Sequence, residues 1–147
     1  MLRLSKKADY ALMAMKHLAL KNAASSTSAR EIAEQYDIPL ELMAKVLQRL
    51  VRTGLLVSTQ GTRGGYTLSR RATLISVTDV IQAIDGPFTV TACSTENSDC
   101  EQYSKCSIRD PLWQIRERIV AALSTVTIAE IANDNVATTP VVAVVRR

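Results

Sequence analysis

The three cysteines of this 147-residue chain, Cys93, Cys100 and Cys106, lie within one polar stretch. They do not follow a periodic apolar face, so packing as small apolar side chains does not explain them. An odd number of cysteines argues against a disulfide framework, and spacers of six and five residues allow three thiolates to converge on one centre. We therefore predict that they bind a metal or a metal cluster. A metal-free redox switch and an inert loop are the alternatives.

The charge of the chain is divided unequally between its two halves. Residues 1–71 contain twelve Lys and Arg and five acidic residues, whereas residues 72–147 contain six and nine, which gives the net charge of +4. A basic N-terminal half is typical of a protein that binds a polyanion such as nucleic acid. A solvated basic surface without a partner gives the same excess, so charge alone does not separate the two interpretations.

The N-terminal segment combines basic residues with an apolar run, as a targeting sequence does. Asp9, Lys16 and His17 interrupt that run, which is too short for a signal peptide or a membrane span. The segment instead predicts an amphipathic helix, and we expect a cytoplasmic protein with no membrane partner.

Three helices are predicted in the basic half. Apolar residues recur at helical spacing from about Ser5 to Lys21, and a short second helix follows the capping-box pattern of Ser28 and Glu31. A third helix begins at Pro39 and stops at Gly54. Two short helices joined by a tight turn predict a helix-turn-helix.

A β-hairpin is predicted directly after these helices. Leu55–Thr59 and Tyr66–Ser69 are strand-like, and residues 61–65 between them supply glycines for a tight turn. Helix-turn-helix and hairpin together predict a winged helix, so the expected fold is mainly α with a small β-hairpin wing.

The predicted third helix carries a polar stripe opposite its apolar face. Lys45, Arg49 and Arg52 are spaced so that one side of the helix presents all three, with Gln48 as their neighbour. Such a stripe can contact phosphates and base edges of DNA. The alternative is a solvated face on which Glu41 pairs with Lys45.

The predicted hairpin favours the DNA-binding interpretation. Arg63 lies at its glycine-rich tip, where a cation is suited to the concentrated negative potential of the minor groove. The residues that we expect at a DNA interface are Ser28, Pro39, Leu40, Glu41, Lys45, Gln48, Arg49, Arg63, Gly64 and Tyr66.

A long helix is predicted in the C-terminal half. Asp110 and Pro111 open it, and its apolar stripe is more extensive than one small domain needs, which implies a partner helix. Two-fold dimers are common among helix-turn-helix proteins, while packing back on the wing domain is the alternative. The predicted divisions are a winged helix-turn-helix domain (1–85), a cysteine loop (86–110), a dimerisation helix (111–132) and a tail expected to be a mobile extension (133–147).

Taken together, these motifs resemble the Rrf2 family, which includes the IscR, NsrR and RirA regulators. The resemblance is carried by the first helix from Leu2 to Ala11, the wing from Gly61 to Tyr66, and the C-x6-C-x5-C loop before Leu112-Trp113. The resemblance covers about residues 1–132. Within the family, Asp9-Tyr10-Ala11 and Lys45-Val46-Leu47 look most similar to regulators of the SUF iron–sulfur assembly system. The resemblance implies a dimeric, cytoplasmic, bacterial transcription factor that binds a pseudo-palindromic DNA operator and senses its signal through an iron–sulfur cluster.

The resemblance also bears on the cluster ligands. IscR-like members carry a histidine three residues after the last cysteine, where this chain has Arg109, which disfavours a 2Fe-2S cluster with a histidine ligand. Some NsrR-like members use an aspartate of the first helix from the other subunit, and Asp9 matches that position. The expected metal ligands are therefore Cys93, Cys100, Cys106 and Asp9, the last from the partner subunit, around a 4Fe-4S cluster. The alternative is that Asp9 binds no metal and only stabilises the first turn of the first helix through a favourable interaction with the helix dipole.

Two other classes of function compete with a cluster-based regulator. An enzyme with a cysteine nucleophile would need a base, but the chain has one histidine and no recognisable catalytic triad or phosphate-binding loop. We therefore predict no enzymatic activity. A regulator that uses its cysteines for zinc binding or for cluster-free thiol redox sensing is the second alternative.

Overall fold

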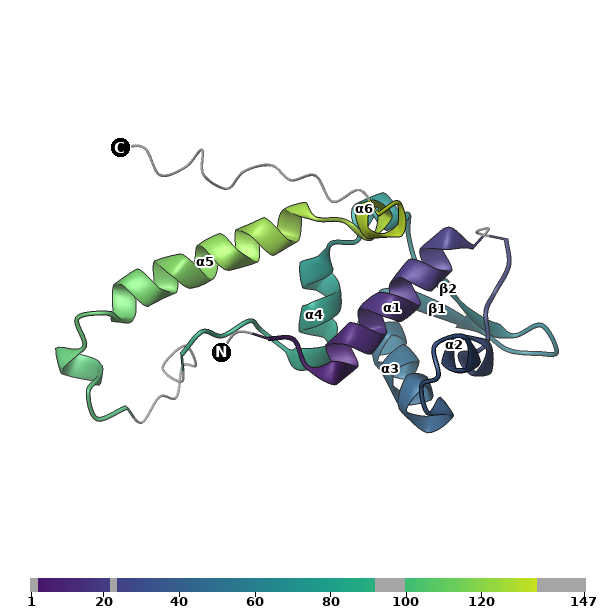
Figure 1. Ribbon diagram of the computed structural model, residues 1–147, viewed down its shortest axis with the longest axis horizontal. Coiled ribbons are helices and arrows are strands. Elements are labelled where there is room, and N and C mark those ends of the chain that lie inside the picture. Colours follow the sequence, from purple (N-terminus) through teal and green to yellow (C-terminus); the bar gives the residue numbers. More distant parts are fainter. Residues whose placement is uncertain (1–2, 22–23, 92–99, 135–147) are drawn as a thin grey trace.

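The computed structural model describes residues 3–21, 24–91 and 100–134. This part of the chain is mainly helical, with one antiparallel two-stranded hairpin (Figure 1). In chain order the elements are α1 (Lys6–Leu20), α2 (Ala29–Gln35), α3 (Leu40–Arg52), β1 (Leu56–Thr59), β2 (Gly65–Leu68), η1 (Ala72–Leu74), α4 (Val77–Asp85), η3 (Tyr103–Lys105), α5 (Arg109–Thr125) and α6 (Ile128–Ala132). The predicted order of three helices, hairpin and further helices is confirmed.

The first two helices begin at serine caps. The Ser5 hydroxyl accepts a hydrogen bond from the backbone N–H of Ala8, and the Ser28 hydroxyl accepts one from Glu31, each at 3.1 Å. Only half of the predicted capping box forms, because the Glu31 carboxylate pairs with Lys21 at the end of α1. This ion pair ties α2 to α1.

The hydrophobic core lies where α1 crosses α3, α4 and α6 (Figure 1). Its fully buried side chains come from helices and from the segment before α4, and burial of each contributes about 1.5–3 kcal/mol. The largest of them are Met15, Ile32, Met43, Leu47, Leu50, Ile75 and Ile128.

The stretch assigned from the sequence to one dimerisation helix, residues 111–132, is divided in two. Val126 is extended, and α6 begins after Thr127, whose side chain forms a reciprocal capping box with Glu130. Ile128 is fully buried, and α6 packs against α1. Residues 128–132 therefore belong to the core of the N-terminal domain, because the chain must turn back after α5 to bury Ile128.

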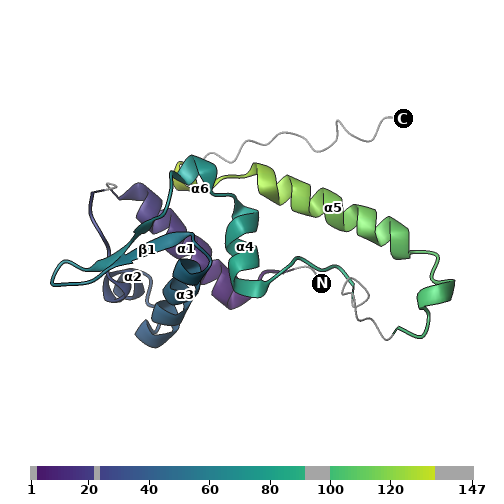
Figure 2. The same ribbon diagram turned by 180° about the vertical axis from the view of Figure 1, so that it is seen from behind.

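In contrast to α6, α5 projects from the body of the molecule (Figures 1 and 2). It is joined to α4, where the Ser124 hydroxyl donates to Thr78 Oγ1 at 3.0 Å. No residue of α5 is buried in the single chain. Trp113 and Ile115 each expose 46% of their surface, and Ile108, just before the helix, exposes 59%.

His17 is a packing residue on α1. Its Nδ1 atom lies 3.0 Å from the Tyr36 hydroxyl, while its Nε2 atom is buried without a hydrogen-bond partner among the described residues. Burial lowers the pKa of His17 below 6.5, and the charge of Lys21 lowers it further, against a smaller opposite effect of Glu31. Protonation of His17 is therefore less favourable in the folded than in the unfolded protein.

We expect the metal-free protein to lose stability as the pH falls below about 6.5, the ordinary pKa of histidine. In that range the unfolded chain binds more protons at His17 than the folded chain does. The contribution of neutral His17 to stability is therefore complete above its pKa in the unfolded chain, and it is lost as the pH falls toward its lower pKa in the folded protein. Urea unfolding across this range measures the loss. His17→Gln should flatten the dependence, and an unchanged pH profile in that variant would contradict the assignment.

Candidate functional site

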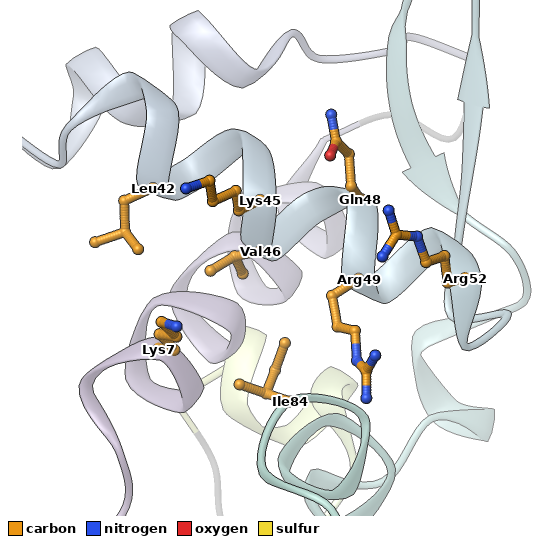
Figure 3. Close-up of a pocket in the computed structure, with 8 residues that line it drawn as sticks. All are labelled: Lys7, Leu42, Lys45, Val46, Gln48, Arg49, Arg52 and Ile84. Carbon is orange, nitrogen blue, oxygen red and sulfur yellow. The ribbon is translucent and has the colours of Figure 1, made fainter.

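A depression of about 450 Å³ lies on the exposed side of α3 (Figure 3). Most of its lining comes from α3, while Lys7 enters from α1 and Ile84 from α4. The lining residues are Lys7, Leu42, Lys45, Val46, Gln48, Arg49, Arg52 and Ile84. Three residues expected at a DNA interface, Lys45, Gln48 and Arg49, are thus brought together.

The polar side of this depression is strongly basic. Lys7, Lys45, Arg49 and Arg52 line it, and none of its lining residues is acidic. No ion pair joins Glu41 to Lys45 in the described part of the chain. Four cations without an acidic partner in the lining repel one another and attract a polyanion, so the surface suits a phosphate backbone.

Sequence reasoning missed Lys7 as a member of this surface. Lys7 lies far from α3 in the chain and reaches the depression because α1 packs across α3. The only sequence signal was the basic pair Lys6-Lys7 at the start of the first helix. That signal indicates charge without indicating which surface receives it.

Arg49 also has a structural contact. Its Nε group donates to the backbone oxygen of Ala83 in α4 at 2.9 Å, and Figure 3 shows the side chain turned toward Ile84. The side chain is thus held between α3 and α4, and it also lines the depression. This arrangement favours a phosphate contact by Arg49, whereas the side chains of Lys45 and Gln48 are exposed and can reach base edges.

A second depression, of about 460 Å³, lies between the wing tip and the start of α2. It brings together Ser28, Arg63 and Gly64 from the expected interface, with Glu31 also in its lining. Arg63 is exposed, and its backbone oxygen accepts a hydrogen bond from the Ser26 hydroxyl at 2.6 Å. The wing tip is therefore fixed while the Arg63 side chain remains exposed.

Backbone pairing positions the wing against the helix-turn-helix. Thr27 and Tyr66 exchange two backbone hydrogen bonds, at 3.1 and 2.8 Å. A Cβ atom on Gly65 would lie 2.5 Å from the Thr27 oxygen, and one on Gly64 would lie 2.6 Å from the Thr59 oxygen. Gly65 is required where the wing approaches Thr27, and Gly64 is required where the hairpin closes on Thr59. Tyr66 is half-buried against the core.

The other expected interface residues lie at the start of α3. Pro39, Leu40 and Glu41 are exposed there, with 38% of Leu40 accessible, but they line neither depression. Pro39 provides no side-chain cap for α3. The N-terminal turn of this helix is therefore an open surface beside the basic depression.

The cysteine loop can be described only in part. Cys93 lies outside the described residues, whereas Cys100 is exposed and Cys106 is half-buried, both as free thiols. Three metal-binding side chains do not gather anywhere within residues 3–21, 24–91 and 100–134 of one chain. Two accessible thiols outside the core nevertheless fit soft-ligand chemistry, which suits iron–sulfur clusters and zinc.

Arg109 contacts the turn that precedes it. Its Nε group pairs with Asp110 Oδ1 at 3.0 Å, and its Nη1 group donates to the backbone oxygen of Tyr103 at 3.3 Å. The hydrogen bond to Asp110 raises the pKa of Arg109 above its already high ordinary value. A permanently charged guanidinium has no lone pair for a metal, so Arg109 is not a ligand.

Asp9 lies in the first turn of α1, half-buried beside a depression of about 510 Å³ that Arg3 and Ser5 also line. The start of α5, next to Cys106, is well separated from α1 in both ribbon views (Figures 1 and 2). Asp9 and Cys106 of one chain therefore do not form a common site. A metal centre that uses both residues needs a second subunit.

None of the described helices has the length and apolar character required to cross a membrane. The described surface carries the two depressions around α3 and the wing, the depression beside Asp9, and exposed apolar residues of α5.

Comparison with known proteins gives a consistent result. A family model described as "Rrf2: Iron-dependent Transcriptional regulator" matches residues 4–134. The HTH-type transcriptional regulator IscR of Escherichia coli is 32% identical over 134 residues, which cover 90% of this chain and 82% of IscR.

Solved structures share the fold. CymR of B. subtilis, described as the global cysteine regulator, has a TM-score of 0.74 at 26% identity and covers 92% of this chain and 99% of CymR. IscR of T. potens has a TM-score of 0.70 at 25% identity, with coverage of 90% and 88%. The predicted winged helix-turn-helix fold and the prediction of a regulator rather than an enzyme are confirmed. This chain belongs to the Rrf2 family of DNA-binding transcriptional regulators.

Proposed function

We propose that the protein is a homodimeric transcriptional regulator that senses iron–sulfur status, oxygen or redox stress, iron or nitric oxide through an iron–sulfur cluster. The observation that carries this proposal is the position of the thiols: Cys100 and Cys106 are free and lie outside the core, immediately before the exposed helix α5. The likeness to IscR supports the proposal. The same fold occurs in the cysteine regulator CymR, so the cysteine loop, and not the fold, carries the argument.

For the DNA complex, we propose that α3 enters the major groove and the wing follows the backbone to the minor groove. The exposed side chains of Lys45 and Gln48 would meet base edges, while Lys7 and Arg49 would meet phosphates. Arg63 at the wing tip would enter the minor groove. The resemblance of the first helix to SUF regulators makes iron–sulfur assembly genes the first targets to test.

We propose that a second copy of the chain covers the apolar side of α5. Ile115 is close to half exposed in the single chain, and Ile119 lies one turn further along the same side of the helix. Burying these side chains between two copies would remove apolar surface from water and place two α3 helices on a pseudo-palindromic operator.

Ile115→Asp should convert the dimer into a monomer at micromolar concentrations, because a dimer would bury an unpaired carboxylate. The single chain should remain folded, since 46% of Ile115 is already accessible in it. Gln114→Asp adds the same charge at an exposed neighbouring position and should remain dimeric. Sedimentation together with circular dichroism separates these results. A dimeric Ile115→Asp variant of native stability would locate the interface elsewhere.

For the metal site, we propose a 4Fe-4S cluster bound by Cys93, Cys100 and Cys106 of one subunit and by Asp9 of the partner subunit. The contacts of Arg109 support a fourth ligand from elsewhere, since the residue at the histidine position of IscR-like members is a bound cation. When bound, the cluster would supply redox chemistry and an exchangeable iron site. A 2Fe-2S cluster and a zinc ion are the alternatives.

The first turn of α1 offers a route from the metal site to the DNA surface. It carries Asp9 and also Lys7, which lines the basic depression of α3. The Ser5 hydroxyl donates to Asp85 Oδ1 at 2.6 Å and so ties this turn to the end of α4. Movement of Asp9 would therefore shift Lys7 relative to α3, and a coupling of about 1–3 kcal/mol between the two sites would be typical.

Anaerobic purification tests the proposed function directly. We expect a coloured protein that contains iron and acid-labile sulfide in equal amounts, with DNA affinity that differs between the loaded and metal-free forms. Zinc would give no visible absorption band because its d shell is filled. A colourless protein that contains zinc or no metal after anaerobic reconstitution would contradict the cluster.

A further inference from the structure

Arg109 makes three contacts, two of which span the last cysteine of the loop. Its Nη1 group donates to the backbone oxygen of Tyr103 at 3.3 Å, and its guanidinium carbon lies 4.6 Å from the centre of the Tyr103 ring. Its Nε group pairs with Asp110 at 3.0 Å. Cys106 lies between the two segments that these contacts join, the turn η3 and the first turn of α5.

We infer that Arg109 is a positioning residue for the metal site, which holds η3 against the start of α5 so that Cys106 is in place before metal binds. The inference rests on the proposed function and adds a role for a residue that supplies no ligand. We name the set of contacts among Tyr103, Arg109 and Asp110 the arginine clasp.

The turn η3 needs such an anchor because it has little other support. Residues 100–105 are all exposed, and η3 contributes no side chain to the core. Its backbone hydrogen bonds, from Tyr103 to Cys100 and from Lys105 to Gln102, are local. Segments with few buried contacts and exposed backbone hydrogen bonds open readily. The arginine clasp connects this turn to the long helix α5, which has a regular backbone of its own.

Holding the turn in advance affects metal binding through conformational entropy. A loop that is already ordered loses less freedom when its thiolates bind a metal, so it binds more tightly and releases the metal less readily. Of the two described cysteines, Cys106 lies within the segment that the arginine clasp spans and is half-buried, whereas Cys100 lies before it and is exposed. The effect should therefore be strongest at Cys106.

The chemistry of the arginine clasp requires arginine in particular. A planar guanidinium can lie over an aromatic ring and at the same time donate hydrogen bonds in fixed directions to a carbonyl and a carboxylate. A lysine ammonium keeps the positive charge but cannot form this set of contacts. Arg109→Lys therefore separates positioning from a simple effect of charge near the thiolates.

Hydrogen exchange of the metal-free full-length protein tests the ordering of the turn. Exchange of the Tyr103 and Lys105 amides should accelerate severalfold in Arg109→Lys and in Arg109→Ala, while amides of α4 and α6 remain as in the wild type. Tyr103→Phe is the matched control, because it retains the ring and the backbone oxygen, and it should behave as the wild type. Tyr103→Ala removes the ring and should accelerate exchange.

Anaerobic reconstitution of the same variants tests the consequence for the metal site. We expect cluster loss in air to accelerate severalfold in Arg109→Lys and Arg109→Ala, but not in Tyr103→Phe. The inference would be overturned if Arg109→Lys showed wild-type amide exchange at Tyr103 and Lys105. It would also be overturned if exchange in that variant were faster but cluster loss were not. A wild-type protein that takes up no iron would instead contradict the proposed function, so the two failures are distinguishable.

Discussion

Cys106→Ala is expected to abolish cluster assembly, with visible absorption and bound iron falling to background after anaerobic reconstitution. The change would remove one of the three thiolates that we propose as cluster ligands, and no histidine lies in the described loop to replace it. Any difference in DNA affinity between iron-treated and untreated protein should disappear with the cluster. Absorption spectra, iron and sulfide analysis and operator binding measure these effects.

Two further variants sharpen this result. Ser107→Ala alters the exposed residue next to Cys106 and should assemble the cluster normally. Asp9→Ala should still assemble it, because three cysteines remain, but should lose it faster in air, because a hard carboxylate is a replaceable ligand at one iron. A Cys106→Ala protein with wild-type iron content would exclude the three-cysteine site. An Asp9→Ala protein with a wild-type spectrum and lifetime would exclude only Asp9.

Arg63→Glu is expected to lower operator affinity by about ten- to a hundredfold, as loss of a single good DNA contact does. The reversed charge would lie at the wing tip, where the side chain is exposed and has no ion-pair partner in the described part of the chain. Fewer counterions would be released on binding, so the slope of log affinity against log salt should decrease by about 1. Titrations of operator DNA at several salt concentrations measure both effects.

Arg118→Glu provides the matched control for charge. It makes the same reversal at an exposed position of α5, a helix that lies away from α3 and the wing (Figure 1). Its affinity and salt dependence should remain close to those of the wild type, since salt screens charges beyond about 8–10 Å. Equal losses in the two variants would indicate a nonspecific effect of net charge and would remove Arg63 from the proposed interface.

Features specified by neighbouring residues could be predicted from the sequence alone. The serine cap at Ser28, the glycines of the wing and the apolar faces of the first three helices each depend on residues a few positions apart. The cationic stripe of α3 follows from the same helical period. The concentration of cysteines in a polar loop likewise required no knowledge of long-range packing. These signals were sufficient to predict the fold class and to select the cysteines and the basic residues of α3 and the wing as candidates, whereas Asp9 was selected only through the family resemblance.

Tertiary structure decided which surfaces those elements share. The apolar pattern continues from α5 into α6, and only long-range pairing near Ser76 and Thr127 makes the chain turn and bury Ile128. Lys7 joins the surface of α3, and Arg49 is tied to α4, because helices distant in sequence pack together. Periodicity identifies an apolar or charged face of an element but carries no information about which distant segment covers it.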